Sequence, residues 1–305
     1  MRTGGEQLHE LHLKYNKPVT ETISVRSSVR TYANKSLKDK DKKEIANALQ
    51  NFPRGDYRFA LTDLAGTSAI ARKLGTYGVI KGAQNYLVGI MRGKKRKDKT
   101  TALHFGFDFE QVILKATELG LGTCWLGGTF NPLSFSGKLN LRKGERIVMV
   151  SPLGYPAGAE SIYSRAASAV TRSRQRKHWD ELFFYGLPGV PLARETAKAY
   201  EKALEMVRLA PSAVNTQPWR VILINGSFHF FAAETRYYNL VRNDFFLFND
   251  LGIAMSHFTL SCRVLGLKGK WLMISPGLPP KSGLSYIRTW QPASGYNNQK
   301  LVRSG

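Results

Sequence analysis

Apolar residues recur along the chain at two periods, one typical of helices and one of strands. Intervals of three and four residues predict helices over residues 40–51, 109–119 and 197–208. Gly120 is a residue type that ends a helix readily, and Pro211 stops the third helix because its ring clashes with the preceding turn. Short apolar runs predict strands over residues 57–62, 87–91, 146–150, 221–224 and 228–231.

Two stretches of the chain resemble each other. Residues 104–125 align without gaps to residues 250–271, and six positions coincide: Gly106/Gly252, Leu114/Leu260, Leu119/Leu265, Gly120/Gly266, Leu121/Leu267 and Trp125/Trp271. A second match pairs residues 43–62 with 199–224, each a helix followed by a strand. The order of these pieces predicts two copies of one unit, a first half over residues 20–187 and a second half over 188–290.

Composition narrows the class of protein. The chain has 305 residues, which suffices for one large domain or two small ones. It has no apolar run of the ~20 residues that cross a bilayer, and its first residues lack the apolar core of a signal peptide. Cys124 and Cys262 lie far apart, which is not the pattern of a disulfide framework. We therefore expect a cytoplasmic protein without a membrane partner.

The net charge of +23 is high, with 45 Lys+Arg against 22 Asp+Glu. Such a charge predicts attraction to polyanions or to an anionic ligand. The densest basic run, residues 92–99, is typical of a solvated loop, and a nucleic-acid patch is the alternative. The sequence has no helix-turn-helix spacing, no RNA-binding aromatic strand pair and no zinc-finger pattern, so we expect no nucleic-acid partner.

Three segments carry candidate binding chemistry. Arg26, Ser28 and Arg30 occupy alternate positions, so in an extended chain they point the same way and suit a phosphate. The pair Gly127–Gly128 would let a flat ring lie against the backbone. The polar loop over residues 209–219, between a helix and a strand, suggests a hydrogen-bonded ligand. Each segment also has an ordinary interpretation: a solvated arginine pair, a plain turn and an Asx or Ser turn.

Other candidates have weaker support. Arg172, Arg174 and Arg176 repeat the alternate basic pattern, although a Ser/Arg-rich segment is also typical of a flexible linker. His9 and His12 share a helical face but lack a third metal ligand, so we expect no metal site. Cys124 and His257 are expected to be core or interface residues.

Four segments together resemble the signature segments of the FMN-dependent nitroreductase family, in its tandem-duplicated variety. They are residues 26–30 (RSSVR), 119–128 (LGLGTCWLGG), 153–156 (LGYP) and 210–219 (APSAVNTQPW). The resemblance covers residues 20–275 and implies an α+β fold, a three-layer α/β/α sandwich with a mainly antiparallel sheet. Ordinary members are homodimers with flavin sites at the interface, so the resemblance implies two degenerate halves fused into an intramolecular pseudo-dimer with one FMN per chain.

Carried over by position, the resemblance implies a set of cofactor-binding residues. Arg26, Ser27, Ser28 and Arg30 would hold the phosphate and ribityl chain, with Arg174 and Arg176 nearby. Leu126, Gly127 and Gly128 would lie beside flavin N5. Pro211, Ser212, Ala213 and Asn215 would reach the isoalloxazine ring from the second half. No side chain is implied as a catalytic acid or base, because the flavin does the chemistry.

The function expected from the resemblance is an FMN-dependent NAD(P)H oxidoreductase. Ping-pong hydride transfer through N5 would reduce an electron-poor small-molecule acceptor, a nitroaromatic or a quinone. Two alternatives stay open: a flavin-binding protein without reductase turnover, and a basic nucleic-acid-associated protein. The chain would be a monomer or a homodimer.

Overall fold

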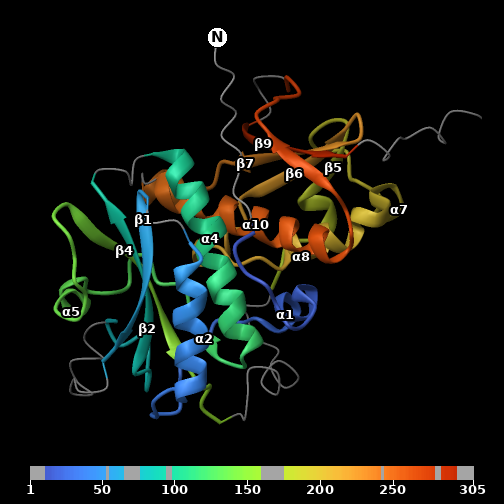
Figure 1. The fold of residues 1–305 in the computed structure, drawn as a ribbon. Coiled ribbons are helices and arrows are strands. Elements are labelled where there is room, and N and C mark those ends of the chain that lie inside the picture. Colours follow the sequence, from blue (N-terminus) through green and yellow to red (C-terminus); the bar gives the residue numbers. More distant parts are fainter. Residues whose placement is uncertain are drawn as a thin grey trace, which may run out of the picture.

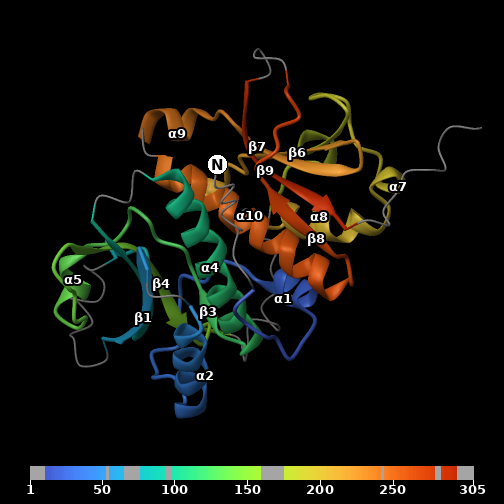
Figure 2. The same ribbon diagram turned by 45° about the horizontal axis from the view of Figure 1, so that its top comes forward.

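The computed structural model describes residues 11–52, 55–64, 76–93, 98–158, 175–241, 244–278 and 283–293. Two long helices cross at the centre, and one β-sheet lies to each side of them (Figure 1; Figure 2). The fold is α+β with mainly antiparallel sheets, as the sequence predicts. No helix in the described part of the chain is long and apolar enough to span a membrane.

The first half contains helices α1 (Val19–Val25), α2 (Asp39–Gln50), α4 (Lys99–Glu118) and α5 (Leu133–Ser136), and strands β1 (Tyr57–Asp63), β2 (Asn85–Arg92), β3 (Gly122–Thr123) and β4 (Glu145–Gly154). The second half contains α7 (Arg194–Ala197), α8 (Glu201–Arg208), α9 (Arg236–Val241), α10 (Asp244–Val264), β6 (Trp219–Ile224), β7 (Ser227–Ala233), β8 (Gly269–Leu272) and β9 (Leu284–Pro292). Strand β5 (Phe183–Tyr185) precedes them.

The two sheets share one topology. The first has the strand order β1-β2-β4-β3, and the second has β5-β6-β7-β9-β8. Replacing β1, β2, β3 and β4 by β6, β7, β8 and β9 converts one order into the other, with every corresponding pair antiparallel. Strand β5 adds to the second sheet by a parallel pairing with β6. The last strand of the first half, as bounded at residue 187, therefore adds to the sheet of the second half.

The long helices α4 and α10 end in the same way. Gly120 adopts φ +81°, Leu121 N–H donates to Ala116 O, and Gly120 N–H donates to Thr117 O. Gly266 adopts φ +69°, and the corresponding bonds run from Leu267 to Cys262 and from Gly266 to Arg263. This is a Schellman motif, in which a glycine in the left-handed region satisfies the last carbonyl groups of a helix. The sequence repeat thus marks a repeat of backbone structure.

Helices α4 and α10 approach each other through two glycines. A Cβ atom on Gly106 would lie 2.1 Å from the carbonyl oxygen of Asn249, and one on Gly252 would lie 2.0 Å from that of Leu103. Leu103 and Asn249 correspond to each other when the ungapped alignment of the two copies is extended by one residue. The same contact is therefore made twice with the roles exchanged, as at the two-fold axis of a symmetric dimer. The chain is an intramolecular pseudo-dimer.

Some predicted boundaries were wrong. Helix α4 begins at Lys99, ten residues before the predicted start at 109, because the Asp98 side chain caps it by accepting a bond from Thr100 N–H. The predicted helix over residues 197–208 is interrupted at Lys198, whose φ is +51°, and continues as α8.

Residues 11–17, which precede α1, pack against α4. The backbone N–H groups of Asn16 and Lys17 both donate to Glu118, and Leu13 enters the core beside α2. His9 lies outside the described residues, so its pairing with His12 is not observed. Within the described residues no group of three His, Cys, Asp or Glu side chains could hold a metal ion.

Candidate functional site

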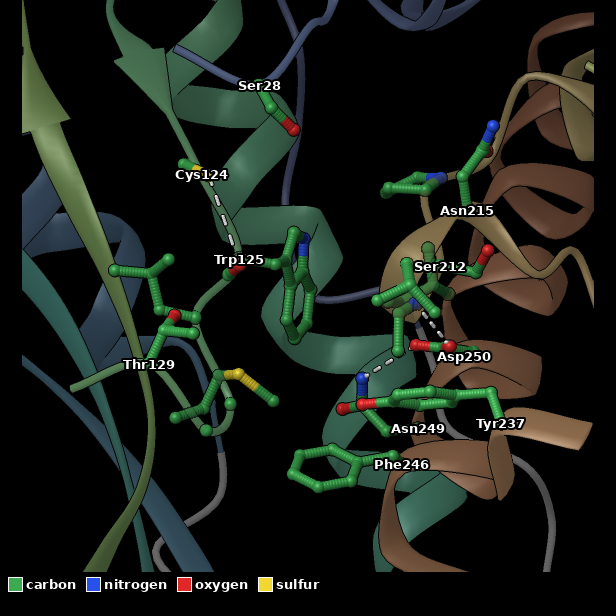
Figure 3. Close-up of a pocket in the computed structure, with 18 of the residues that line it drawn as sticks. Ser28, Cys124, Trp125, Thr129, Ser212, Asn215, Tyr237, Phe246, Asn249 and Asp250 are labelled. Atoms are coloured by element: carbon green, nitrogen blue, oxygen red, sulfur yellow. Dashed lines mark hydrogen bonds between the residues drawn. The ribbon is translucent and has the colours of Figure 1, made fainter. Parts of the chain in front are cut away.

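A cavity of about 530 Å³ lies between the two halves. Figure 3 shows Ser28, Cys124, Trp125 and Thr129 on one side of it and Ser212, Asn215, Tyr237, Asn249 and Asp250 on the other. Its volume falls within the range typical of small-molecule and cofactor sites. The first half supplies one wall and the second half supplies the other, so neither half forms the cavity alone.

The first wall begins where α1 ends. Arg26 follows α1 directly, and Ser28 then forms a parallel β-bridge with Thr123. The backbone is extended there, so Arg26, Ser28 and Arg30 all line the cavity, as the alternate spacing predicts. Ser27 is buried and is not among the lining residues, because alternate side chains of an extended chain point to opposite sides.

The pair Gly127–Gly128 belongs to the same wall of the cavity. Leu126 bridges Val150 of β4, and this pairing directs Gly127 and Gly128 into the cavity. A Cβ atom on Gly127 would lie 2.3 Å from the ring of Phe246, so glycine lets this ring approach the backbone. A Cβ on Gly128 would meet nothing within 4 Å, which leaves its backbone open to a ligand.

The opposite wall is the loop after α8. Pro211, Ser212, Ala213 and Asn215 line the cavity there. Val214, Asn215 and Gln217 adopt φ angles of +43°, +59° and +49°, a region that costs free energy for residues other than glycine. Side-chain hydrogen bonds hold this shape: Ser212 Oγ accepts from Gln217 N–H at 2.8 Å, and Gln217 Nε2 donates to Asn215 O at 3.2 Å.

Arg176 joins the loop to the basic segment before it. Its guanidinium lines the cavity and donates to Asn215 Oδ1 at 3.2 Å and to Leu209 O at 3.1 Å. Arg172 and Arg174 lie outside the described residues. Of the basic positions expected near the phosphate, the cavity wall therefore shows Arg26, Arg30 and Arg176, all of which belong to the first half.

Comparison of the sequence with models of protein families shows which family the chain belongs to. Residues 18–262 match the protein family described as "Putative TM nitroreductase". The chain belongs to this nitroreductase family. It joins two halves of the nitroreductase type in one polypeptide, which agrees with the repeated topology and the exchanged glycine contact.

Comparison with solved structures gives one match over almost the whole chain and further matches over about half of it. A Thermotoga maritima protein described as a "putative nitroreductase" is similar with a TM-score of 0.56 at 20% identity, over 94% of this chain and 98% of that chain. A nitroreductase family protein from Clostridium novyi has a TM-score of 0.38 at 19% identity, over 48% and 90% of the two chains. A nitroreductase with bound FMN from Desulfitobacterium hafniense has a TM-score of 0.36 at 19% identity, over 48% and 92%. No curated protein matches the chain.

The nitroreductase pocket has a second group of lining residues that the motifs did not reveal. Tyr237 comes from α9, and α10 supplies three residues near its start and one further along. The four on α10 are Phe246, Asn249, Asp250 and Ile253. Asn249 and Asp250 are the polar residues of the otherwise apolar stretch 245–255 of α10, and this was the signal in the sequence that could have found them. Cys124 is buried as expected and also lines the pocket.

Asp250 is the carboxyl group of the pocket wall and is 3% exposed. Its Oδ2 atom accepts from Ala213 N–H at 2.7 Å and from the Tyr238 hydroxyl. Burial raises the pKa of Asp250 to about 7, while these hydrogen bonds act in the opposite direction. The carboxyl group therefore anchors the strained loop and titrates near neutral pH.

A buried hydrogen-bond chain links the pocket to the contact between the halves. Trp125 Nε1 donates to Glu110 Oε2 at 2.8 Å, and Glu110 Oε1 lies 2.9 Å from His257 Nε2. His257 Nδ1 lies 2.8 Å from Met206 O on α8, and since a carbonyl only accepts, Nδ1 carries a proton. Glu110 and His257 are fully buried. His257 is thus an interface residue, as expected, and it connects α10 to the helix that leads into the loop.

Among the described residues, this hydrogen-bond chain is found on only one side of the pseudo-dimer. In the alignment of the copies, Ser256 takes the place of Glu110, and Gln111 takes the place of His257. Trp271, the counterpart of Trp125, donates to Thr259 instead. The Glu110–His257 pair therefore lies on the side of the pseudo-dimer where both halves line the described pocket.

Proposed function

We propose that the chain binds one FMN in this pocket and acts as an NAD(P)H-dependent reductase of electron-poor acceptors such as nitroaromatics or quinones. The observation that carries the proposal is the convergence of both halves on one cavity, with three arginines of the first half and the polar loop of the second half in its wall. Membership of the nitroreductase family supports a general oxidoreductase activity.

The lining residues fit a phosphorylated, flat, amide-bearing ligand. Arg26, Arg30 and Ser28 offer charge-assisted and hydroxyl hydrogen bonds to a phosphate. The open side of Gly128 admits a ring against the backbone. Asn249 is 1% exposed, lines the pocket and has an Oδ1 atom without a hydrogen-bond partner among the described residues, so it can accept from a ligand N–H.

Bound FMN would supply the redox chemistry by taking a hydride from NAD(P)H at N5 and passing it to the acceptor. Residues of this chain would bind and orient it. Arg26, Ser28, Arg30 and Arg176 would hold the phosphate and ribityl chain, and the open Gly128 backbone would lie by the ring. Pro211, Ser212, Ala213 and Asn215 would contact the ring from the second half, while Trp125, Tyr237 and Phe246 keep the substrate side apolar and aromatic.

The corresponding segments on the other side of the pseudo-dimer differ from those of the pocket, and this supports a single flavin site per chain. Met273 and Ile274 replace Gly127 and Gly128 there and are 66% and 55% exposed. The segment that corresponds to the ring-contacting loop is short, and its Phe52 is buried in the core against His12. Neither the glycine pair nor the polar loop is available for a second flavin.

Titration with FMN and anaerobic addition of NADH or NADPH test this function. We expect quenching of flavin fluorescence, loss of the visible flavin absorption on reduction, and its return with a nitroaromatic or quinone. Bound flavin that neither nucleotide reduces would favour the redox-idle alternative. Salt-dependent binding to DNA without flavin uptake would favour the nucleic-acid alternative.

Replacing Gly127 by alanine is expected to weaken FMN binding by about tenfold or more. The new Cβ would displace the Phe246 ring into the pocket, and such overpacking costs about 1–3 kcal/mol. Fluorescence titration measures the effect. Shortening the opposing side chain in the double variant G127A/F246L should recover part of the affinity lost in G127A. Equal FMN affinity of G127A and the natural chain would contradict the contact.

A further inference from the structure

Asp250 is a buried carboxyl group at the wall of a pocket proposed to hold an anionic cofactor. In the described part of the chain its hydrogen-bond partners are all neutral: Ala213 N–H, the Tyr238 hydroxyl and, at 3.4 Å, Asn249 Nδ2. No ion pair joins it to a described Lys, Arg or His side chain. A buried carboxylate without a cation is costly, and protonation removes that cost.

Among the described ionisable groups around Asp250, the Tyr238 hydroxyl favours the carboxylate through its hydrogen bond, but no positively charged side chain forms an ion pair with it. Helix α9 presents Tyr237 and Tyr238, and α4 presents Glu110, whose charge raises the pKa of Asp250 further after the larger effect of burial. Arg176 and the arginines of the first wall line the same pocket, but Arg176 donates to Asn215 and Leu209. These arginines are the groups that a phosphate would occupy.

The hydrogen bonds around Asp250 can accept an extra proton without a change of heavy-atom positions. With the carboxylate ionised, Tyr238 donates to Oδ2. With the carboxyl protonated, it can donate to the Tyr238 oxygen, Tyr238 can donate to Thr216 Oγ1 at 2.8 Å, and Thr216 donates to Ala213 O at 3.0 Å. Both patterns keep the Ala213 N–H bond that anchors the loop. The site is therefore built to hold Asp250 in either state.

We propose that FMN binding is coupled to uptake of one proton from solvent by Asp250, so that the pocket releases FMN more readily above neutral pH. This inference rests on the proposed function. FMN brings a phosphate charge and displaces water from the wall, and both effects disfavour the carboxylate. Below about pH 7 Asp250 is already protonated, so the titration of Asp250 does not change the FMN affinity there. As pH rises above about 7, the FMN affinity falls.

The chain offers a matched control for this carboxyl group. Asp108 on α4 is fully buried, accepts from the Tyr57 hydroxyl at 2.7 Å and has a pKa raised by burial to about 7. It resembles Asp250 in all three respects, but it is not among the residues that line the pocket. If proton uptake were a general property of a buried Asp–Tyr pair, replacing either Asp108 or Asp250 would change it. If proton uptake is coupled to FMN binding, only the replacement of Asp250 should change it.

Calorimetric titration of the full chain with FMN tests the coupling. Titrations run from about pH 6 to about pH 9 in buffers of different ionisation enthalpy, with the natural chain, Asp250→Asn and Asp108→Asn. We expect proton uptake above neutral pH in the natural chain and in Asp108→Asn, and its loss in Asp250→Asn. As pH rises, the ratio of the Kd of the natural chain to the Kd of Asp250→Asn should increase. The total increase should be about tenfold for each unit by which FMN raises the pKa of Asp250. Titration of the FMN phosphate is common to all three proteins and cancels in the ratio.

Equal proton uptake in the natural chain and Asp250→Asn, or a Kd ratio that is constant with pH, would overturn the inference and leave the proposed function intact. Absence of FMN binding by the natural chain would overturn both. Tyr238→Phe gives a second measurement if Asp250→Asn does not fold. It removes a hydrogen bond that favours the carboxylate, so the pH window of proton uptake should move upward. An unchanged window would also contradict the inference.

Discussion

Replacing Glu110 by alanine is expected to lower the free energy of unfolding by about 2–6 kcal/mol, because each buried polar group left without its hydrogen-bond partner costs about 1–3 kcal/mol. Glu110 is fully buried and binds both His257 and Trp125, so its loss leaves two buried nitrogen atoms without an acceptor. Urea denaturation followed by circular dichroism measures the change.

A double-mutant cycle makes this expectation specific. If Glu110 and His257 act as one unit, the double variant E110A/H257A should cost much less than the sum of the two single variants. Ser256→Ala is the control, because Ser256 is the counterpart of Glu110 in the other copy and its buried Oγ has no partner among the described residues. Additive losses in the cycle, or an equal loss in S256A, would contradict the role of the pair.

Replacing Gly106 or Gly252 by alanine is expected to destabilise the chain by about 3 kcal/mol, which exceeds the helix propensity that alanine gains. Each new Cβ would meet a backbone carbonyl oxygen of the opposite helix at about 2 Å, and a backbone atom cannot turn aside as a side chain can. Thermal or urea unfolding measures the loss.

The two substitutions together should cost less than their sum, because the first already separates α4 from α10. Gly137→Ala is the matched control: Gly137 has an ordinary helical φ of −66°, and a Cβ there would meet nothing within 4 Å. Its effect should stay within about 0.5 kcal/mol. Full stability of G106A and G252A would show that the halves do not pack through this contact.

Much of the fold could be predicted because its signals are local. Gly120 and Gly266 mark the helix ends because the left-handed backbone there favours glycine over other residues. The ungapped match between the copies predicted two copies of one unit, and the two sheets indeed share one strand order. The early start of α4 was missed because it depends on the Asp98 cap, which the apolar period does not reveal.

The candidate site was predicted only as far as its motifs extend. Arg26, Gly127 and Asn215 belong to short segments with recognisable spacing, and all three line one pocket. Phe246 was missed because α10 is buried on almost all sides, and the polar pair Asn249 and Asp250 does not by itself show which side of the helix faces a cavity. That information exists only once the second half packs against the first.

The stoichiometry of FMN binding tests the central claim most directly. The claim is that two degenerate halves form one flavin site between them. Titration of the purified chain with FMN, followed by fluorescence quenching to an end point, should give one FMN per chain, and both Arg26→Ala and Asn215→Ala should weaken that single site. Two equivalents per chain, no uptake, or a loss of affinity in only one of the two variants would contradict it.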